Sequence, residues 1–249
     1  MMIEANNPDL KSWVSIEENS DFSIQNIPFG IIKYQKESPR VASRIGDYAL
    51  DLLKLFQKGY LDGLGFEESD FNQARLNTLM KKGKSASRQL RNRLSELLSG
   101  KEERLKNNSA DQADILIPID QVENEMPVDI GDYTDFYSSI EHATNVGTMF
   151  RDPDNALLPN WKYIPVGYHG RASSIILSGT PIYRPTGQQK PNPDEPPVFG
   201  PCKLLDFELE MAFITYDGKP LGDRISTKEA DDYIFGMVLF NDWSARDIQ

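Results

Sequence analysis

Four carboxylate residues in the second half of the chain have types and spacing that suit a metal site: Asp135, Glu208, Glu210 and Asp242. Both glutamates lie in the segment CKLLDFELEMAFIT, where apolar and polar residues alternate. Side chains two residues apart on a β-strand share a face, so the segment predicts a strand with both glutamates on its polar face. Carboxylates crowded on one face repel one another unless solvent or a cation compensates their charge. A ligand set made only of oxygens suits Mg²⁺ or Ca²⁺ rather than zinc.

Asp242 follows a second apolar run, YIFGMVLFN, and precedes Ser244-Ala-Arg-Asp247, which has the spacing of a helix capping box. This order predicts a strand that ends at Asp242, with a helix beginning just after it. For Glu208 and Glu210 an alternative interpretation stays open, because the polar side of any amphipathic strand can simply face water.

The chain contains two histidines, His142 and His169. His142 lies seven residues after Asp135 in DYTDFYSSIEHATNVGTMFR, a segment rich in aromatic residues that ends at Arg151. Histidine titrates near neutral pH, so beside a metal-bound water it would serve as a general base. The alternative for His142 is a purely structural histidine. For His169, in PVGYHGRASS, we expect a surface turn without a catalytic role.

The elements that would position these residues can be outlined from the patterning of the chain. Short strands are predicted between residues 12 and 50, in SWVSI, FGIIKYQ and PRVASRIGDYALDL. Two amphipathic helices should follow, one ended by Gly83 and the other by Gly100. Their apolar stripes are predicted to lie in the core: Phe71, Leu76, Leu79 and Met80 in the first, and Leu90, Leu94, Leu97 and Leu98 in the second.

The second half of the chain has a different residue pattern. The charged segment 101–114 is predicted to link two units, and from residue 115 onward the pattern favours strands with long loops. Residues 181–201 contain seven prolines, which predicts an extended arm rather than a regular element.

Composition restricts the class of protein. With 249 residues, 39% apolar and 26% charged, the chain is expected to be an ordinary soluble globular protein. A net charge of −11 argues against nucleic acid or an anionic membrane as a partner. The single cysteine, Cys202, excludes an internal disulfide, favours a reducing compartment and should behave as a small apolar residue. No signal peptide or membrane span is recognisable, so we expect a cytoplasmic protein.

Several ordered blocks of the chain resemble the fumarylacetoacetase family: DYTDFYSS, EHATNVGTMFR, PVGYHGRASS, PTGQQKP, CKLLDFELEMAF and FGMVLFNDWSARDIQ. The amino-terminal part also fits the small SH3-like barrel that precedes the catalytic domain in that family. The resemblance implies a mainly β, α+β fold. Residues 1–119 would form the SH3-like domain with helices, and residues 120–249 would form part of a catalytic domain built as a mixed β-sandwich or roll.

The same resemblance implies metal-dependent hydrolysis of the carbon–carbon bond of fumarylacetoacetate, giving fumarate and acetoacetate, in the last step of tyrosine and phenylalanine degradation. It implies that Ca²⁺ or Mg²⁺ is held by Asp135, Glu208, Glu210 and Asp242, and that His142 is the base that activates water. Four further residues would contact the small diketo acid substrate: Tyr137, Arg151, Tyr168 and Gln249.

Members of this family are homodimers and continue well beyond the position of Gln249, so the chain resembles a form truncated at its carboxyl end. We expect such a form to expose apolar strand faces, to be poorly soluble or to dimerise abnormally, and to hydrolyse little substrate. Two alternatives are a non-catalytic short form that acts as an interaction or structural protein, and a related oxo-acid hydrolase or acylpyruvase.

Overall fold

The computed structural model describes residues 4–248 and has a mixed α+β fold, with small antiparallel sheets and seven α-helices in that range. It divides into two compact units. The first contains residues 1–128 and 179–249, and the second contains residues 129–178. None of the helices in the described part of the chain combines the length and apolar character that a membrane crossing requires.

The amino-terminal part of the first unit is built on a five-stranded antiparallel sheet with the order β4-β3-β2-β1-β5. Gly46, with φ of +52°, makes the tight turn between β2 and β3, a conformation that glycine adopts at little cost. The predicted strands around 29–35 and 39–52 are confirmed, whereas SWVSI (residues 12–16) is not a strand. The strands are β1 (Phe29–Tyr34), β2 (Arg40–Ile45), β3 (Tyr48–Asp51), β4 (Leu116–Pro118) and β5 (Val122–Glu125).

The longest helix of this region is α4 (Gly83–Ser99), and its leucine stripe confirms the prediction, because Leu90, Leu94, Leu97 and Leu98 are fully buried. Gly100 follows in the left-handed conformation that often ends a helix. The other predicted helix, which was expected to run up to Gly83, is not one continuous helix, so that prediction was wrong. Phe71 ends α2 (Glu68–Phe71), Leu76 is the N-cap of α3 (Asn77–Met80), and Leu79 and Met80 lie in α3. Gly83 is the first residue of α4. Helix α1 (Leu52–Gln57) comes before them, capped by Asp51.

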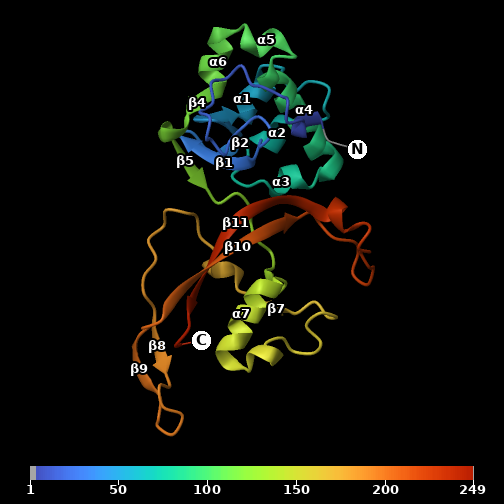
Figure 1. The fold of residues 1–249 in the computed structure, drawn as a ribbon. Coiled ribbons are helices and arrows are strands. Elements are labelled where there is room, and N and C mark those ends of the chain that lie inside the picture. Colours follow the sequence, from blue (N-terminus) through green and yellow to red (C-terminus); the bar gives the residue numbers. More distant parts are fainter. Residues whose placement is uncertain (1–3, 249) are drawn as a thin grey trace. The chain divides into compact units, whose positions relative to one another are not determined.

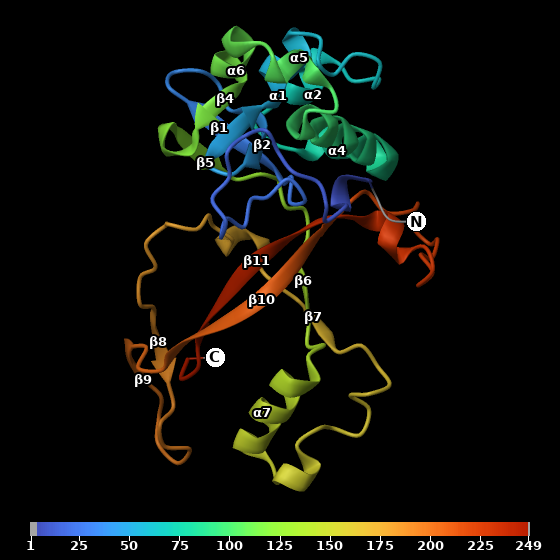
Figure 2. The ribbon, with the colours of Figure 1, turned by 45° about the horizontal axis from the view of Figure 1, so that its top comes forward.

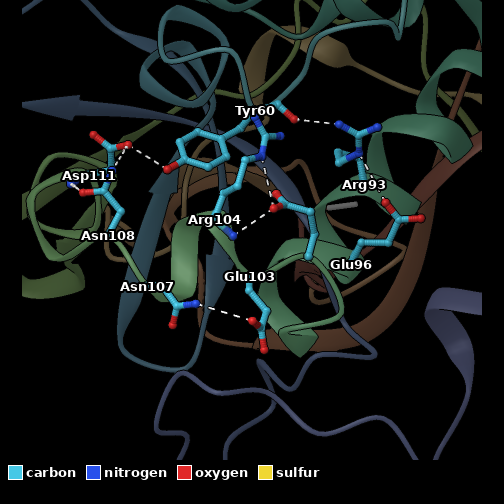
Figure 3. Close-up of polar contacts among 9 residues, drawn as sticks. Tyr60, Arg93, Glu96, Glu103, Arg104, Asn107, Asn108 and Asp111 are labelled. Atoms are coloured by element: carbon cyan, nitrogen blue, oxygen red, sulfur yellow. Dashed lines mark hydrogen bonds and ion pairs between the residues drawn. The ribbon is translucent and has the colours of Figure 1, made fainter.

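The segment 101–114 is folded, so its predicted role as a linker was wrong. It forms α5 (Glu103–Lys106) and α6 (Ser109–Ile115), and the helices bury Leu105 and Ile115 completely. Asp111 accepts hydrogen bonds from the Tyr60 hydroxyl at 2.7 Å and from Lys58 at 2.8 Å. Figure 3 shows Asp111 facing the Tyr60 ring within this network of polar contacts. Two apolar anchors and long-range polar contacts explain why a charged sequence is ordered here.

The carboxyl-terminal part of the first unit consists of two antiparallel strand pairs. β8 (Thr186–Gln189) pairs with β9 (Val198–Pro201), so the proline-rich segment contains regular strands and is not only the extended arm that was predicted. β10 (Leu205–Thr215) pairs along its whole length with β11 (Ile234–Ala245), which Figure 1 shows as two long neighbouring arrows. Residues 190–197 connect β8 to β9, and the longer segment 216–233 connects β10 to β11.

The second unit contains the helix α7 (Ile140–Phe150) and a short pair of strands, β6 (Thr134–Phe136) and β7 (Gly167–His169) (Figure 2). The chain also contains short 3₁₀ helices in both units: η1 (Glu4–Asn6), η2 (Ile119–Gln121), η3 (Pro153–Asn155), η4 (Ala172–Ser174) and η5 (Ala230–Tyr233).

Candidate functional site

The β10–β11 pair gathers three of the predicted metal ligands on one face. The register places Glu208 directly opposite Asp242, and Glu210 is the next residue on the same face of β10. Directly opposed residues of an antiparallel pair carry their side chains to the same side of the sheet. The alternation of residues in β10 therefore predicted this face correctly.

The side chains of Glu210 and Asp242 approach closely, because a carboxylate oxygen of one lies within 4.8 Å of a carboxylate oxygen of the other. Both residues are half-buried. At this separation two anions repel, and a hard divalent cation coordinated by carboxylate oxygens would remove the repulsion. The chemistry of these donors thus fits Mg²⁺ or Ca²⁺.

Glu208 is held by two neighbours from the end of β11. The Arg246 guanidinium lies 2.5 Å from Glu208 Oε1, and the Ser244 hydroxyl donates to the same oxygen at 3.3 Å. Arg246 also contacts Asp206 Oδ2 at 3.2 Å. The backbone amide of Phe207 and then Arg246 hold the pKa of Asp206 below its usual value, because both stabilise the charged carboxylate.

Asp242 does not end its strand, so the expected strand end and helix start were wrong. β11 continues to Ala245 because its pairing with β10 runs on through Ser244 opposite Asp206 and Ala245 opposite Leu205. No helix begins at Ser244 in the described residues, and the predicted capping box is not formed.

Asp247 instead anchors the segment that leads into β10. Its carboxylate accepts the Cys202 thiol at 2.8 Å and the backbone amides of Lys203 and Leu204 at 2.8 and 3.3 Å. These donors, the thiol first, lower the pKa of Asp247 to about 2. Cys202 is buried as expected, and burial followed by its bond to Asp247 raises the pKa of the thiol.

In the second unit, Asp135 lies on β6 opposite Tyr168 of β7. The Tyr168 hydroxyl donates to Asp135 Oδ2 at 2.6 Å. This short hydrogen bond to a charged acceptor restricts the orientation of the carboxylate. The structure thus connects a predicted metal ligand with a residue predicted to contact substrate.

His142 lies in the first turn of α7, where the Ser139 side chain caps the helix by accepting the backbone amide of His142 at 3.2 Å. The imidazole ring is half-buried and contacts the Tyr137 ring edge to face, with centroids 5.1 Å apart. The cap and the aromatic contact give the imidazole a defined place near the start of the helix.

A cavity of about 190 Å³ lies within the second unit, and two predicted substrate residues, Tyr137 and Arg151, line it. The Arg151 guanidinium donates to the carbonyl of Ala156 through Nε at 3.1 Å and Nη2 at 2.9 Å. Trp161 also lines the cavity and donates its indole N–H to the Tyr137 carbonyl. The cavity is mostly apolar with one cationic side chain, which suits a small organic anion.

The remaining predictions concern His169 and Gln249. His169 is the last residue of β7 and pairs with Thr134, so the expected turn was wrong. Its side chain is exposed, and its Nδ1 lies 3.4 Å from the Tyr133 carbonyl. Gln249 lies outside the described residues. Sequence reasoning missed the contacts of Arg246 and Ser244 with Glu208. A signal was present for Ser244, because it lies two residues after Asp242 on the same face of β11, and Arg246 follows directly after the strand ends at Ala245.

Two family models match the chain. The model described as "Fumarylacetoacetase N-terminal" matches residues 25–127, and "Fumarylacetoacetate (FAA) hydrolase C-terminal" matches residues 133–249. The chain is 49% identical to the fumarylacetoacetase of Homo sapiens, 48% identical to that of Emericella nidulans and 47% identical to that of Arabidopsis thaliana. Each match covers 96% of this chain. The chain spans only 57–58% of the length of these relatives.

Proposed function

The chain belongs to the fumarylacetoacetase family, and we propose that it contributes the metal-binding and water-activating part of a carbon–carbon bond hydrolase. The proposed substrate is fumarylacetoacetate, which would be cleaved to fumarate and acetoacetate in the last step of tyrosine degradation. The observation that carries this proposal is the acidic face of β10–β11, where Glu208 lies opposite Asp242 and Glu210 lies beside them.

The proposed ligands of the cation are Asp135, Glu208, Glu210 and Asp242. Carboxylate oxygens match the preference of Ca²⁺ and Mg²⁺, and the close approach of Glu210 to Asp242 supports a shared ion. When bound, the cation would polarise the oxygens of the diketo acid and hold them in one plane.

The proposed base is His142. Its imidazole would take a proton from water as the water oxygen bonds to the ketone carbonyl carbon of the fumaryl group. The carbon–carbon bond then breaks, and the electron pair leaves with the acetoacetate carbon, which takes up a proton. The half-buried ring, held against Tyr137, supports this role because a general base must keep a fixed orientation.

Tyr137, Arg151, Tyr168 and Gln249 are proposed to contact the substrate. The cavity lined by Tyr137 and Arg151 supports two of these roles, since a guanidinium beside an apolar cavity can pair with a substrate carboxylate. Tyr168 would combine substrate contact with its hydrogen bond to Asp135.

Finer features of the architecture are proposals as well. We infer an SH3-like barrel in the amino-terminal domain and a sandwich or roll in the catalytic domain. The expected boundary at residue 119 is better drawn close to residue 128, because β5 pairs with β1 and the two family models meet between residues 127 and 133. A cytoplasmic homodimer without nucleic-acid or membrane partners completes the proposal.

Calorimetry with CaCl₂ and MgCl₂, followed by an assay of fumarylacetoacetate decay, tests the function. The chain should bind one cation, and Asp242→Asn should weaken the binding at least tenfold because it removes a charged ligand. Asp217→Asn, which changes an exposed acid outside the acidic face, is the matched control and should bind as the unmodified chain does.

A chain that binds no divalent cation would contradict the metal-dependent reaction. Binding combined with faster cleavage of acylpyruvates than of fumarylacetoacetate in a substrate panel would instead assign the chain to a related oxo-acid hydrolase. Replacement His142→Ala should abolish cleavage while leaving cation affinity within about twofold, because the imidazole is proposed to handle a proton and not the ion.

A further inference from the structure

Arg246 joins two acids that neighbour each other on the face of β10. One nitrogen of its guanidinium, Nη2, lies 2.5 Å from Glu208 Oε1 and 3.2 Å from Asp206 Oδ2, and its Nε lies 3.3 Å from Asp206 Oδ2. The Glu208 side chain is only 18% exposed, so this ion pair is partly shielded from water. A guanidinium pairs with carboxylates in a fixed geometry, which a flexible ammonium group does not impose.

Ser244 reinforces this contact. It is buried, lies opposite Asp206 in the register, and its hydroxyl lies 3.3 Å from both Glu208 Oε1 and the Asp242 carbonyl, two acceptors that share its one hydrogen. The same carboxylate oxygen of Glu208 therefore faces two donors that come from one short stretch of β11 and its extension. Two donors on one oxygen restrict the side-chain rotation of a glutamate, which otherwise has three freely rotating bonds.

We propose that Arg246 is a positioning residue that, with Ser244, orients the Glu208 carboxylate toward the cation. This inference rests on the proposed function, because it takes Glu208 as a ligand. Arg246 is itself cationic, so it would not ligate the ion and would act through Glu208, which it contacts. Residues that hydrogen-bond a ligand fix its orientation, and their loss commonly lowers metal affinity 10–100-fold.

Loss of Arg246 should change the cation affinity in the direction opposite to that expected from its charge alone. Removing a positive charge near a cation site should by itself tighten cation binding, because less charge repels the ion. Removing a residue that orients a ligand should weaken it. Calorimetric titration of Arg246→Met with CaCl₂ or MgCl₂ should therefore show a 10–100-fold larger dissociation constant. Arg246→Lys should recover part of this loss, since it keeps the charge but not the planar guanidinium.

Two controls isolate the path through Glu208. Arg88→Met removes an exposed arginine whose pairing with Asp231 lies away from the acidic face, and it should leave cation affinity unchanged. In a Glu208→Gln background, Arg246→Met should no longer increase the dissociation constant, because the carboxylate that Arg246 orients is gone and only the removal of its positive charge remains. An unchanged or tighter affinity of Arg246→Met alone, or an equal loss in both backgrounds, would overturn the proposal.

A measurement without metal separates this proposal from the proposed function. Melting temperatures of the cation-free chain should show that Arg246→Met lowers Tm, and that the fall is smaller when Glu208→Gln is also present. If the unmodified chain binds no cation, the metal-dependent function fails, and this cycle still decides whether Arg246 holds Glu208. Additive effects on Tm would then refute the positioning role.

Discussion

Individual side chains in this protein often act on partners that lie far away in the sequence. Asp247 illustrates this, because its carboxylate binds a thiol and two backbone amides at residues 202–204. These bonds attach the segment that leads into β10 to the segment that follows β11. A single side chain thus fixes the end of the strand pair that carries the acidic face.

The pH dependence of stability should report this anchor. A carboxyl group whose pKa is lowered on folding stabilises the folded state above its unfolded pKa, near 3.9, and loses this effect as the pH falls toward the folded value. The folded pKa of Asp247 is about 2. We expect Asp247→Asn to lower Tm at pH 7, and the difference from the unmodified chain to shrink between about pH 4 and pH 2.

Thermal melts monitored by circular dichroism at several pH values measure this difference. Asp217→Asn serves as the control, because that acid is exposed. A difference between Asp247→Asn and the unmodified chain that stays constant from pH 7 to pH 2 would show that the carboxylate does not provide the anchor.

At the scale of elements, α7 depends on one close approach. Gly147 is buried in this helix, and a Cβ atom added there would lie 2.1 Å from the carbonyl oxygen of Ala156. The same carbonyl accepts both hydrogen bonds from the Arg151 side chain. Packing of the helix against the following turn therefore also places the cationic side chain that lines the cavity.

We expect Gly147→Ala to destabilise the protein by about 1–3 kcal/mol, because the backbone of Ala156 must move to admit the methyl group. Glycine to alanine in an open helix position stabilises by up to about 1 kcal/mol, so the clash reverses the usual sign. Urea unfolding measures the change. Gly236→Ala is the control, since no atom lies within 4 Å of its added Cβ, and an increase in stability for Gly147→Ala would contradict the close packing.

At the scale of the whole molecule, the β10–β11 pair leaves its apolar face uncovered. Leu209 and Leu239 are each 75% exposed, and Phe207, Met211, Phe213, Met237 and Trp243 are exposed on the same face. The alternation of residues in β10 predicted that Phe207, Leu209, Met211 and Phe213 point away from the acids. The structure adds that they are exposed and that residues of β11 lie on the same face. Contiguous exposed apolar surface favours association.

We therefore expect the chain to self-associate as its concentration rises, and the double change Leu209→Lys with Leu239→Glu to reduce this association without altering net charge. Sedimentation velocity over a range of concentrations is the measurement. Leu221→Lys changes an exposed leucine outside this face and is the control. Equal association of the unmodified chain and the double variant would place the contact elsewhere.

Much of the local structure follows from residue order, because helix and strand periodicity depend on neighbours only a few positions apart. The leucines of α4, the glycine that ends it and the two faces of β10 were predictable for this reason. So was the shared face of Glu208 and Glu210, since two residues along a strand always return to the same side.

Other features depend on contacts between residues that are distant in the sequence, and the predictions made from local composition and spacing were wrong for these features. The charged segment 101–114 is folded because Leu105 and the adjacent Ile115 are buried in the core, and because Asp111 accepts hydrogen bonds from Lys58 and Tyr60. β11 extends past Asp242 because its next residues pair with Asp206 and Leu205 of β10. The same pairing brings Arg246 into contact with Glu208. Residue order determined which chemical groups were present and how they alternate, whereas long-range pairing decided which groups meet, because only a folded backbone brings distant atoms within bonding distance.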